Sequence, residues 1–272
     1  MKIALIILFL NKIVSKESFT SVVSGASRGI GLEFSKQLLK RNDNNIVISL
    51  IRSVNNNVID LQNNHPNRYF PIEIDLHNQE TLDKMANQLK NLVGNDLRVD
   101  LLINTAGILG GNPGDLGPER SIDNIDREWL TKSLETNLIG HVMVTKLCIP
   151  YMKKAFVSKE MPSKIVNISA RVGSISDNYL GGWYSYRMSK AALNMFTKTS
   201  SIELKRHNIL TLSMHPGTTD TDLSKPFQKN VKPDKLLTVS SSVSQMLTVI
   251  DSCNDINNTG SFLSYDGTKI EW

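Results

Sequence analysis

Residues 19–31 read Phe-Thr-Ser-Val-Val-Ser-Gly-Ala-Ser-Arg-Gly-Ile-Gly, an apolar run that passes directly into a glycine-rich turn. The run predicts a buried strand, and the residues after the turn have the apolar spacing of an amphipathic helix. Glycines at such a turn allow the backbone to bend tightly and to approach a pyrophosphate closely. The free N–H groups of the helix N-terminus favour phosphate. This stretch therefore predicts a strand–turn–helix unit that binds a dinucleotide.

Apolar runs and amphipathic stretches continue to alternate over the rest of the chain. Continuous Val/Ile/Leu runs are typical of strands buried on both faces, and their alternation with helices indicates a doubly wound parallel sheet. We expect an α/β protein with a single-domain Rossmann fold over residues 19–272, its parallel β-sheet flanked by helices. The expected strands are Phe19–Ser24, Ile46–Ile51, Tyr69–Ile74, Val99–Asn104, Lys164–Ser169, Leu210–Met214 and Gly260–Ser264. The expected helices are Ile30–Lys40, Thr81–Leu92, Arg127–Lys154, Tyr186–Arg206 and Val239–Ile250.

The composition is that of an ordinary globular protein. Of 272 residues, 40% are apolar and 21% charged, which excludes a disordered chain or a fibre. The formal charge of +5 is spread along the chain without a basic block, so we expect no nucleic-acid partner. Cys148 and Cys253 have neither metal-ligand nor disulfide-framework spacing. We therefore expect no metal and a reducing, cytoplasmic location.

Residues 1–18 form an apolar extension ahead of the expected domain. The apolar run Ile3–Leu10 is too short to cross a bilayer, which takes about 20 residues. A positive start followed by an apolar run also fits a signal peptide, but no small-x-small cleavage site follows before Lys16. We expect an uncleaved extension that packs on the domain or makes weak contact with a membrane surface, and a signal peptide stays open.

Several motifs together resemble the short-chain dehydrogenase/reductase family. They are Gly25-x3-Gly29-x-Gly31 preceded by Ser24, Asp75-Leu76, Asn104-Thr105-Ala106-Gly107, Asn137, Tyr186-x3-Lys190, and Pro216-Gly217 with Thr221 downstream. They occur in the family's order over residues 19–272, and the stretch 174–186 is similar to the branch of C-factor and sniffer-type carbonyl reductases. The resemblance implies an oxidoreductase that transfers hydride between a nicotinamide cofactor and a small carbonyl or alcohol substrate.

The expected cofactor is NADP(H) rather than NAD(H). An NAD site places Asp or Glu at the end of the second strand, whereas here Ile46–Ile51 is followed by Arg52. Arg28 and Arg52 are suited to pairing with a 2′-phosphate. The cofactor-binding residues that the turn and the resemblance imply are Gly25, Ser27, Arg28, Gly29, Ile30, Gly31, Arg52, Asp75, Leu76, Asn104, Ala106, Gly107, Tyr186, Lys190, Pro216, Gly217, Thr219 and Thr221.

Tyr186 and Lys190 are the expected centre of the chemistry. Four residues apart on a helix, they project from the same face. A tyrosine has an ordinary pKa near 10, and a nearby ammonium favours its phenolate. In the reductive direction Tyr186 would donate its proton to the carbonyl oxygen as hydride arrives. By resemblance, Lys190 would also hold the nicotinamide ribose, and Asn137 would hold a water that links Lys190 to solvent.

The serine that the family uses to orient the substrate is missing from its usual place. The strand ends Ile168-Ser169-Ala170, so Ala170 stands where the family usually has that serine. A hydroxyl is needed to polarise the carbonyl oxygen. We expect Ser174 to supply it as the fourth catalytic residue, with Ser169 as the second choice.

The leading interpretation is an NADPH-dependent carbonyl reductase, and two alternatives stay open. One is NAD-dependent oxidation of an alcohol at the same site. The other, which Ala170 keeps open, is a cofactor-binding signalling protein with vestigial activity. Asp220–Leu237 is expected to form a lid, and Gly110–Asp115 the rim of the pocket. By resemblance, Arg127–Lys154 and Tyr186–Arg206 would form the interface of a homo-oligomer, a dimer or tetramer.

Overall fold

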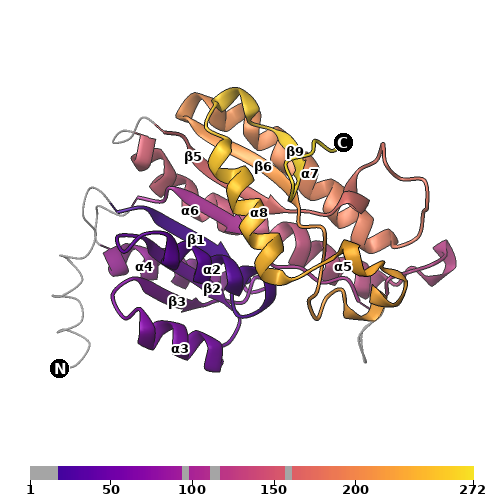
Figure 1. Cartoon of the computed structure of the whole chain (residues 1–272), viewed down its shortest axis with the longest axis horizontal. Coiled ribbons are helices and arrows are strands. Elements are labelled where there is room, and N and C mark those ends of the chain that lie inside the picture. Colours follow the sequence, from indigo (N-terminus) through magenta and orange to yellow (C-terminus); the bar gives the residue numbers. More distant parts are fainter. Residues whose placement is uncertain (1–17, 94–97, 111–116, 157–160) are drawn as a thin grey trace.

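The computed structural model describes residues 18–93, 98–110, 117–156 and 161–272. These residues form a seven-stranded sheet in the order β3-β2-β1-β4-β5-β6-β9, in which every neighbouring pair is parallel (Figure 1). The strands are β1 (Thr20–Ser24), β2 (Ile46–Ile51), β3 (Tyr69–Glu73), β4 (Leu101–Asn104), β5 (Ser163–Ile168), β6 (Ile209–His215) and β9 (Ser261–Ser264). The expected fold class is confirmed, and each expected strand is present with its ends shifted by at most two residues.

Helices cover both faces of the sheet. They are α2 (Gly29–Arg41), α3 (Asn56–Asn64), α4 (Gln79–Val93), α5 (Arg127–Leu134), α6 (Gly140–Phe156), α7 (Tyr184–Leu204) and α8 (Val239–Ser252). Helices α2, α3 and α8 contribute to one apolar core, and α4, α6 and α7 contribute to the core on the opposite face. Figure 1 shows α2 and α8 side by side in front of the sheet.

The two cores explain why the strands are continuously apolar. Successive side chains of a strand point to opposite faces. In β1, Val22 enters the core beneath α4 and α6, whereas Val23 enters the core beneath α2 and α8. Both faces are covered, so a polar side chain has no exposed face on which to lie.

The order of the strands reverses at β1. From β1 the chain builds outward through β2 to β3, then returns to place β4 on the other side of β1. In sheets of this kind a ligand binds at the carboxyl ends of the strands where the order reverses. Ser24 and Asn104, the last residues of β1 and β4, are paired neighbours. The loops that follow these two strands therefore begin side by side.

Two features differ from the sequence-based expectations. The helix expected over Arg127–Lys154 is divided by a π-helical turn, Glu135–Ile139, which lies between α5 and α6. Such turns are frequent at functional sites. Helix α3 was not expected at all, because its sequence is rich in Asn. Asn55 starts this helix, since its side-chain Oδ1 accepts a hydrogen bond of 3.1 Å from the N–H of Val58.

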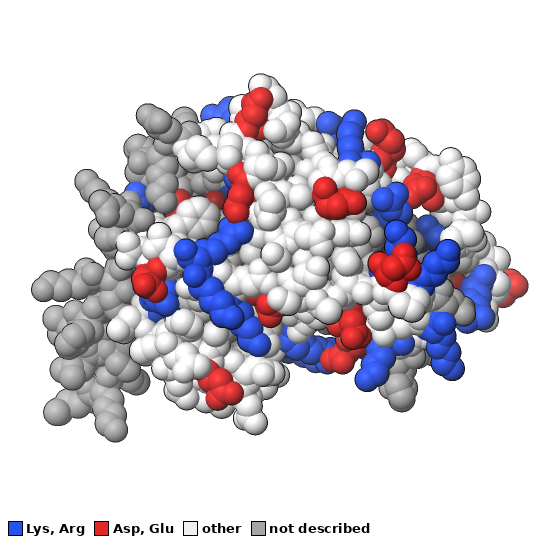
Figure 2. Space-filling view, in the orientation of Figure 1, with Lys and Arg blue, Asp and Glu red and all other residues white. Residues whose placement is uncertain are grey.

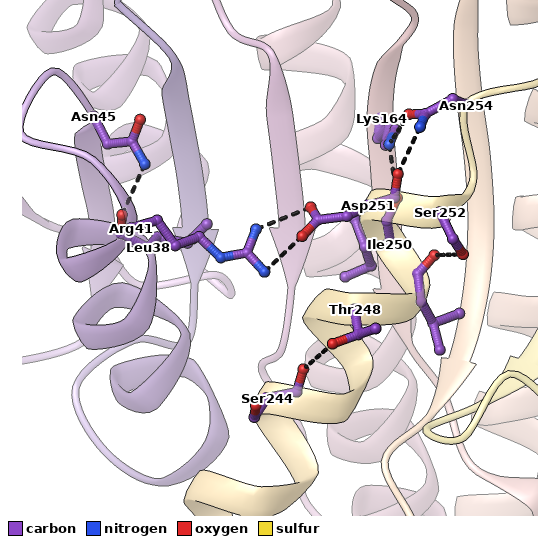
Figure 3. Close-up of polar contacts among 11 residues, drawn as sticks. Leu38, Arg41, Asn45, Lys164, Ser244, Thr248, Ile250, Asp251, Ser252 and Asn254 are labelled. Atoms are coloured by element: carbon purple, nitrogen blue, oxygen red, sulfur yellow. Dashed lines mark hydrogen bonds and ion pairs between the residues drawn. The ribbon is translucent and has the colours of Figure 1, made fainter.

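The C-terminal end of α8 is fastened at two points (Figure 3). Arg41 of α2 forms a two-pronged ion pair with Asp251, at 2.9 and 2.8 Å. Lys164 of β5 donates to the carbonyl oxygen of Ile250 at 2.6 Å and to Asn254 Oδ1 at 2.9 Å. A cation at a helix C-terminus is stabilising, although burial lowers the pKa of Lys164. These contacts hold α8 against both α2 and the sheet.

The surface carries both signs of charge. Figure 2 shows Lys and Arg interspersed with Asp and Glu over the face drawn. Within the described ranges, no helix is long and apolar enough to cross a membrane, and no group of His, Cys, Asp and Glu is arranged to hold a metal. The expected extension, apart from the buried Ser18, and most of the expected rim Gly110–Asp115 lie outside the described residues.

Candidate active site

The glycine-rich turn after β1 lies against the loop after β4. Gly25 has a φ of +70°, and a Cβ atom there would lie 2.7 Å from the backbone nitrogen of Ala106. A Cβ atom on Gly31 would lie 2.5 Å from the carbonyl oxygen of Gly25 and from Thr105 Oγ1. Neither position has room for a side chain, so glycine is required for these segments to meet. Two of the predicted cofactor segments are thereby brought together.

The two arginines expected to select the cofactor follow different strands, β1 and β2. Arg28 precedes α2, and its Nη1 is 3.2 Å from Asp222 Oδ2 in an ion pair whose side chains are about 70% exposed. Arg52 follows β2 and is exposed. Sequence reasoning missed Asn55, whose Nδ2 donates to the carbonyl oxygen of Ser27 at 2.9 Å. An Asn ahead of a helical run was the available signal.

Beyond the turn, Asp75 and Leu76 follow β3. Leu76 packs against Gly140, where a Cβ atom would lie 2.9 Å from its side chain, and Asp75 Oδ1 accepts the N–H of His77 at 3.0 Å. Asp75 is exposed.

Asn104 uses its side chain inside the sheet. Its Oδ1 accepts a hydrogen bond from Ser24 Oγ at 3.2 Å, and its Nδ2 donates to Asn167 Oδ1 at 2.9 Å. Its Nδ2 also lies 3.0 Å from Thr145 Oγ1 of α6. The amide thus joins β1, β4 and β5. The expectation that Asn104, Ala106 and Gly107 line the ribose side of the cofactor stays a prediction.

Tyr186 and Lys190 lie together, buried, in the first turns of α7. The Lys190 Nζ is 5.8 Å from the centroid of the Tyr186 ring and donates to the carbonyl oxygen of Ile168 at 2.9 Å. Burial lowers the pKa of Lys190 to about 7 and raises the pKa of the Tyr186 phenol well above its ordinary value. A phenol held protonated at neutral pH is in the state that a proton donor needs.

Asn137 lies in the π-helical turn and joins three parts of the site. Its Oδ1 accepts the N–H of Ile108 at 2.7 Å, and its Nδ2 donates to the carbonyl oxygen of Ile108 at 2.9 Å and to Ser189 Oγ at 3.0 Å. A Cβ atom on Gly107 would lie 3.5 Å from Asn137 Oδ1 and 3.7 Å from Lys190 Nζ. Asn137, Lys190 and the loop after β4 therefore meet at Gly107.

The two candidate serines bind protein atoms. Ser174 Oγ donates to the carbonyl oxygen of Glu271 at 2.6 Å and accepts the N–H of Asp177. Ser169 Oγ donates to Asn194 Oδ1 at 2.7 Å. A hydroxyl has one hydrogen to donate, and in this structure Glu271 accepts that of Ser174, which ties the loop before α7 to the C-terminal segment. The expected role of Ser174 in polarising a carbonyl stays a prediction.

Ala170 takes the place beside the tyrosine. Leu109, Ala170 and Tyr186 form a small buried apolar cluster, and four half-buried side chains complete it. We call this group the Tyr186 cluster; its other members are Val172, Trp183, Leu223 and Phe227. The position at which the family usually has its serine is therefore next to Tyr186, and here it carries a methyl group.

The segment after β6 reaches both halves of the site. Thr219 Oγ1 donates to the carbonyl oxygen of Pro216 at 2.9 Å, and β7 (Thr218–Thr219) pairs with β8 (Leu236–Leu237). Gly217 has a φ of +75° at the bend. Between these strands, Thr221 comes within 3.8 Å of a Cβ atom built on Gly29, and Leu223 and Phe227 join the Tyr186 cluster. The segment thus links the glycine turn to the tyrosine.

Two buried polar residues near the site were missed by sequence reasoning. His141 Nε2 lies 2.7 Å from the carbonyl oxygen of Ala106, and burial, with a smaller contribution from the charge of Lys190, lowers its pKa to about 3. Glu119 accepts hydrogen bonds at the first turn of α7. No motif marks His141 or Glu119, because each side chain hydrogen-bonds to the backbone of a residue that is distant in the sequence.

This combination of parallel sheet, glycine turn and Tyr-Lys pair defines a class of nucleotide-dependent oxidoreductases. Residues 20–232 match the family described as short chain dehydrogenase, and the chain belongs to it. The resemblance noted from the motifs is thereby confirmed.

Individual relatives agree with this assignment. C-signal of Myxococcus xanthus is 32% identical over 174 residues, which are 64% of this chain and 93% of that protein. Carbonyl reductase Sniffer of D. melanogaster has 31% identity and a TM-score of 0.81, covering 93% of this chain and 99% of that one. An NADPH-bound carbonyl reductase from chicken fatty liver has 31% identity and a TM-score of 0.80, covering 93% and 98%. The chain is therefore similar to both C-signal and carbonyl reductases.

Proposed function

We propose that this chain is an NADPH-dependent reductase that converts an aldehyde or ketone to an alcohol, with Tyr186 as the proton donor. The observation that carries the proposal is that Lys190 lies beside the Tyr186 ring and, together with Asn137, next to Gly107 in the loop after β4. The similarity to two carbonyl reductases supports the direction of the reaction.

The residues around the glycine turn fit NADPH. There is no room for a side chain at Gly25 in the turn or at Gly31 in the first turn of α2, which leaves backbone N–H groups for a pyrophosphate. Arg28 and Arg52 would hold the 2′-phosphate, and no carboxylate follows β2 to favour a free 2′-hydroxyl. The similar chicken reductase binds NADPH. Pro216, Gly217, Thr219 and Thr221 would contact the nicotinamide end, and NADPH supplies the hydride.

The chain's own residues control the proton. Burial keeps the Tyr186 phenol protonated until a substrate oxygen accepts its hydrogen. A protonated Lys190 beside the ring stabilises the phenolate that remains, and its bond to the Ile168 carbonyl fixes its direction. Asn137 holds Ile108 and Ser189, and through Ser189 it supports the backbone of Tyr186. We propose that Lys190 and Asn137 together return a proton to Tyr186 after each turnover.

The proposal is tested by the oxidation of NADPH with a vicinal diketone, followed by its absorbance. Replacing Tyr186 with Phe removes only the hydroxyl, so the affinity for NADPH and the melting temperature should stay as they are. The turnover number should fall by about 10²-fold or more. If Tyr186→Phe retains full turnover, another group donates the proton and the assignment is wrong.

Ala170 gives specific support to a second candidate, a cofactor-binding signalling protein with vestigial activity. One donor is missing from the Tyr186 cluster, and the chain is similar to C-signal. Binding of NADPH without turnover of any aldehyde, quinone or diketone would favour this candidate. NAD-dependent oxidation of an alcohol is the other alternative, and a preference for NAD⁺ over NADP⁺ would favour it.

We further propose that the chain forms a homo-oligomer through α7. Met188, Met195 and Ile202 are spaced by seven residues and are exposed, so they form an apolar line on one face of this helix. A second copy would cover it. Sedimentation should show a dimer or tetramer that Ile202→Glu converts to a monomer, and a monomeric unmodified protein would refute the proposal.

A further inference from the structure

Trp183 has a backbone conformation that a bulky side chain rarely adopts. Its φ of +55° and ψ of +42° place it in the left-handed region, immediately before α7. A non-glycine residue in this region is uncommon, and such residues gather at functional sites. Gly181 and Gly182 also have positive φ, but glycine does so without cost. Something must therefore hold Trp183 in place.

Glu119 is the residue that holds it. Its backbone carbonyl oxygen accepts the N–H of Trp183, and its carboxylate accepts the N–H of Ser185 at 3.1 Å and the hydroxyl hydrogen of Ser185. The side chain of Trp183 makes no capping bond to α7, so the carboxylate takes the place of a cap from outside the helix. Glu119 is only 3% exposed, and an anion at a helix N-terminus is favoured.

The strained backbone aims the indole at Tyr186. The two ring centroids are 6.3 Å apart in an edge-to-face arrangement, and the Phe227 ring lies 5.2 Å from the indole. Trp183 is half-buried, so it is not fully covered by its neighbours, and its ring lies next to that of the proposed proton donor. The neighbouring members of the Tyr186 cluster, Ala170 and Val172, are apolar.

From this geometry we infer that Trp183 is a specificity-determining residue that binds an aromatic group attached to the substrate carbonyl, and that Glu119 is its positioning residue. The inference rests on the proposed function for the reaction, and it adds the substrate class: carbonyl compounds with an aryl group next to the reacting carbon. Aryl groups make favourable offset or edge contacts with an indole, whereas a methyl group in the same place gains little.

The test compares two diketones that differ only in one substituent, 1-phenyl-1,2-propanedione and 2,3-butanedione. The unmodified protein should have a KM for the phenyl compound about tenfold lower or more. Trp183→Leu should raise that KM about tenfold and leave the KM for butanedione within about twofold. Tyr179→Leu, which removes an exposed aromatic ring from the same loop, is the matched control and should change neither. Equal effects of Trp183→Leu on both diketones, or no effect, would overturn the inference.

The role of Glu119 has its own variants. Glu119→Ala should raise the KM for the phenyl compound as Trp183→Leu does, with the turnover number for butanedione retained, and should shift the near-ultraviolet circular dichroism of the indole. Glu119→Gln, which keeps an acceptor for the Ser185 N–H, should restore most of the selectivity. If Glu119→Ala does not fold, Ser185→Ala decides, because it removes only the hydroxyl bond. A Ser185→Ala protein with unchanged selectivity and circular dichroism would then refute the role of Glu119.

Binding measurements separate this inference from the proposed reaction. The phenyl compound should quench the fluorescence of Trp183 in the NADP⁺-bound protein, and Trp183→Leu should lose that quenching. Binding that depends on Trp183 without reduction of either diketone would mean that the proposed reaction fails and the aryl site stands. If both diketones are reduced with the same KM in the unmodified protein and in Trp183→Leu, the proposed reaction stands and the aryl site at Trp183 is refuted.

Discussion

The side chain at position 170 separates this chain from the usual pattern of its family. Ala170 lies in a cluster with Tyr186 in the place where a serine hydroxyl is expected. We propose that neither Ser169 nor Ser174 compensates, because both donate to protein acceptors. A carbonyl oxygen at this site would therefore receive a hydrogen bond from Tyr186 without a second one from these three positions. For the proposed reaction, we expect a lower turnover number with carbonyls that need strong polarisation.

Restoring the hydroxyl should raise activity. We expect Ala170→Ser to increase the turnover number with an unactivated ketone by about 10²-fold, the usual worth of one such donor. Steady-state kinetics with cyclohexanone would measure it. Ser174→Ala is the control: it should leave turnover unchanged and lower the free energy of unfolding by about 1–3 kcal/mol, since it removes the hydrogen bonds to Glu271 and from Asp177. A large loss of turnover in Ser174→Ala would restore the original assignment.

The turn between β1 and α2 shows how one element depends on two others. It touches the loop after β4 at Ala106 and Thr105, and Asn55 at the start of α3 donates to Ser27 within it. The conformation of the turn is therefore set by contacts from two directions. Since these contacts leave no room at Gly31, the element tolerates no side chain there.

Gly31→Ala should damage both stability and cofactor binding. The added methyl group meets backbone atoms of Gly25, which cannot move without opening the turn. We expect a loss of about 1–3 kcal/mol in the free energy of unfolding and at least about tenfold weaker NADPH binding, by chemical denaturation and fluorescence titration. Gly181→Ala, at a position with open space around it, should cost stability through its positive φ alone and leave NADPH binding intact. Unchanged NADPH binding in Gly31→Ala would contradict this account.

At the scale of the whole molecule, burial of the Lys190 amine lowers the free energy of unfolding. Burial holds the pKa of Lys190 at about 7, whereas an unfolded chain has a lysine pKa near 10.4. Between these values the unfolded chain binds a proton that the folded protein does not. The free energy of unfolding must therefore rise with pH across this window, and below about pH 7 both states hold the proton and the contribution is constant.

This contribution can be isolated by removing the amine. Without bound cofactor, the unmodified protein should gain stability from about pH 7 to 10 with a slope approaching about 1.4 kcal/mol per pH unit relative to Lys190→Met. Urea denaturation at several pH values measures the difference. Parallel curves for the two proteins would show that Lys190 keeps its ordinary pKa in the fold. The raised pKa of Tyr186 affects stability only above this window.

The sequence was sufficient for features that depend on local pattern. The strand-turn-helix unit at 19–31, the continuous apolar strands and the Tyr186–Lys190 pair all follow from spacing along a few residues, because helical and extended backbones repeat with known periods. Helix α3 was not predicted, because its Asn-rich sequence has a poor helical propensity. Its stability comes from packing Val58 and Leu61 into the core.

The partners of the site residues followed only from the folded chain. Glu119 lies 66 residues from Ser185, and Ser174 lies 97 residues from Glu271, so no local pattern records either contact. The sequence placed Ser174 near the tyrosine by its position in the chain, but a hydroxyl binds whichever acceptor the fold brings to it. Short stretches of sequence determine the local elements and the spacing of the expected site residues. The hydrogen-bond partner of each polar group depends on how the strands and loops pack. The reason is that a hydrogen bond depends on distance in space and not on separation along the chain.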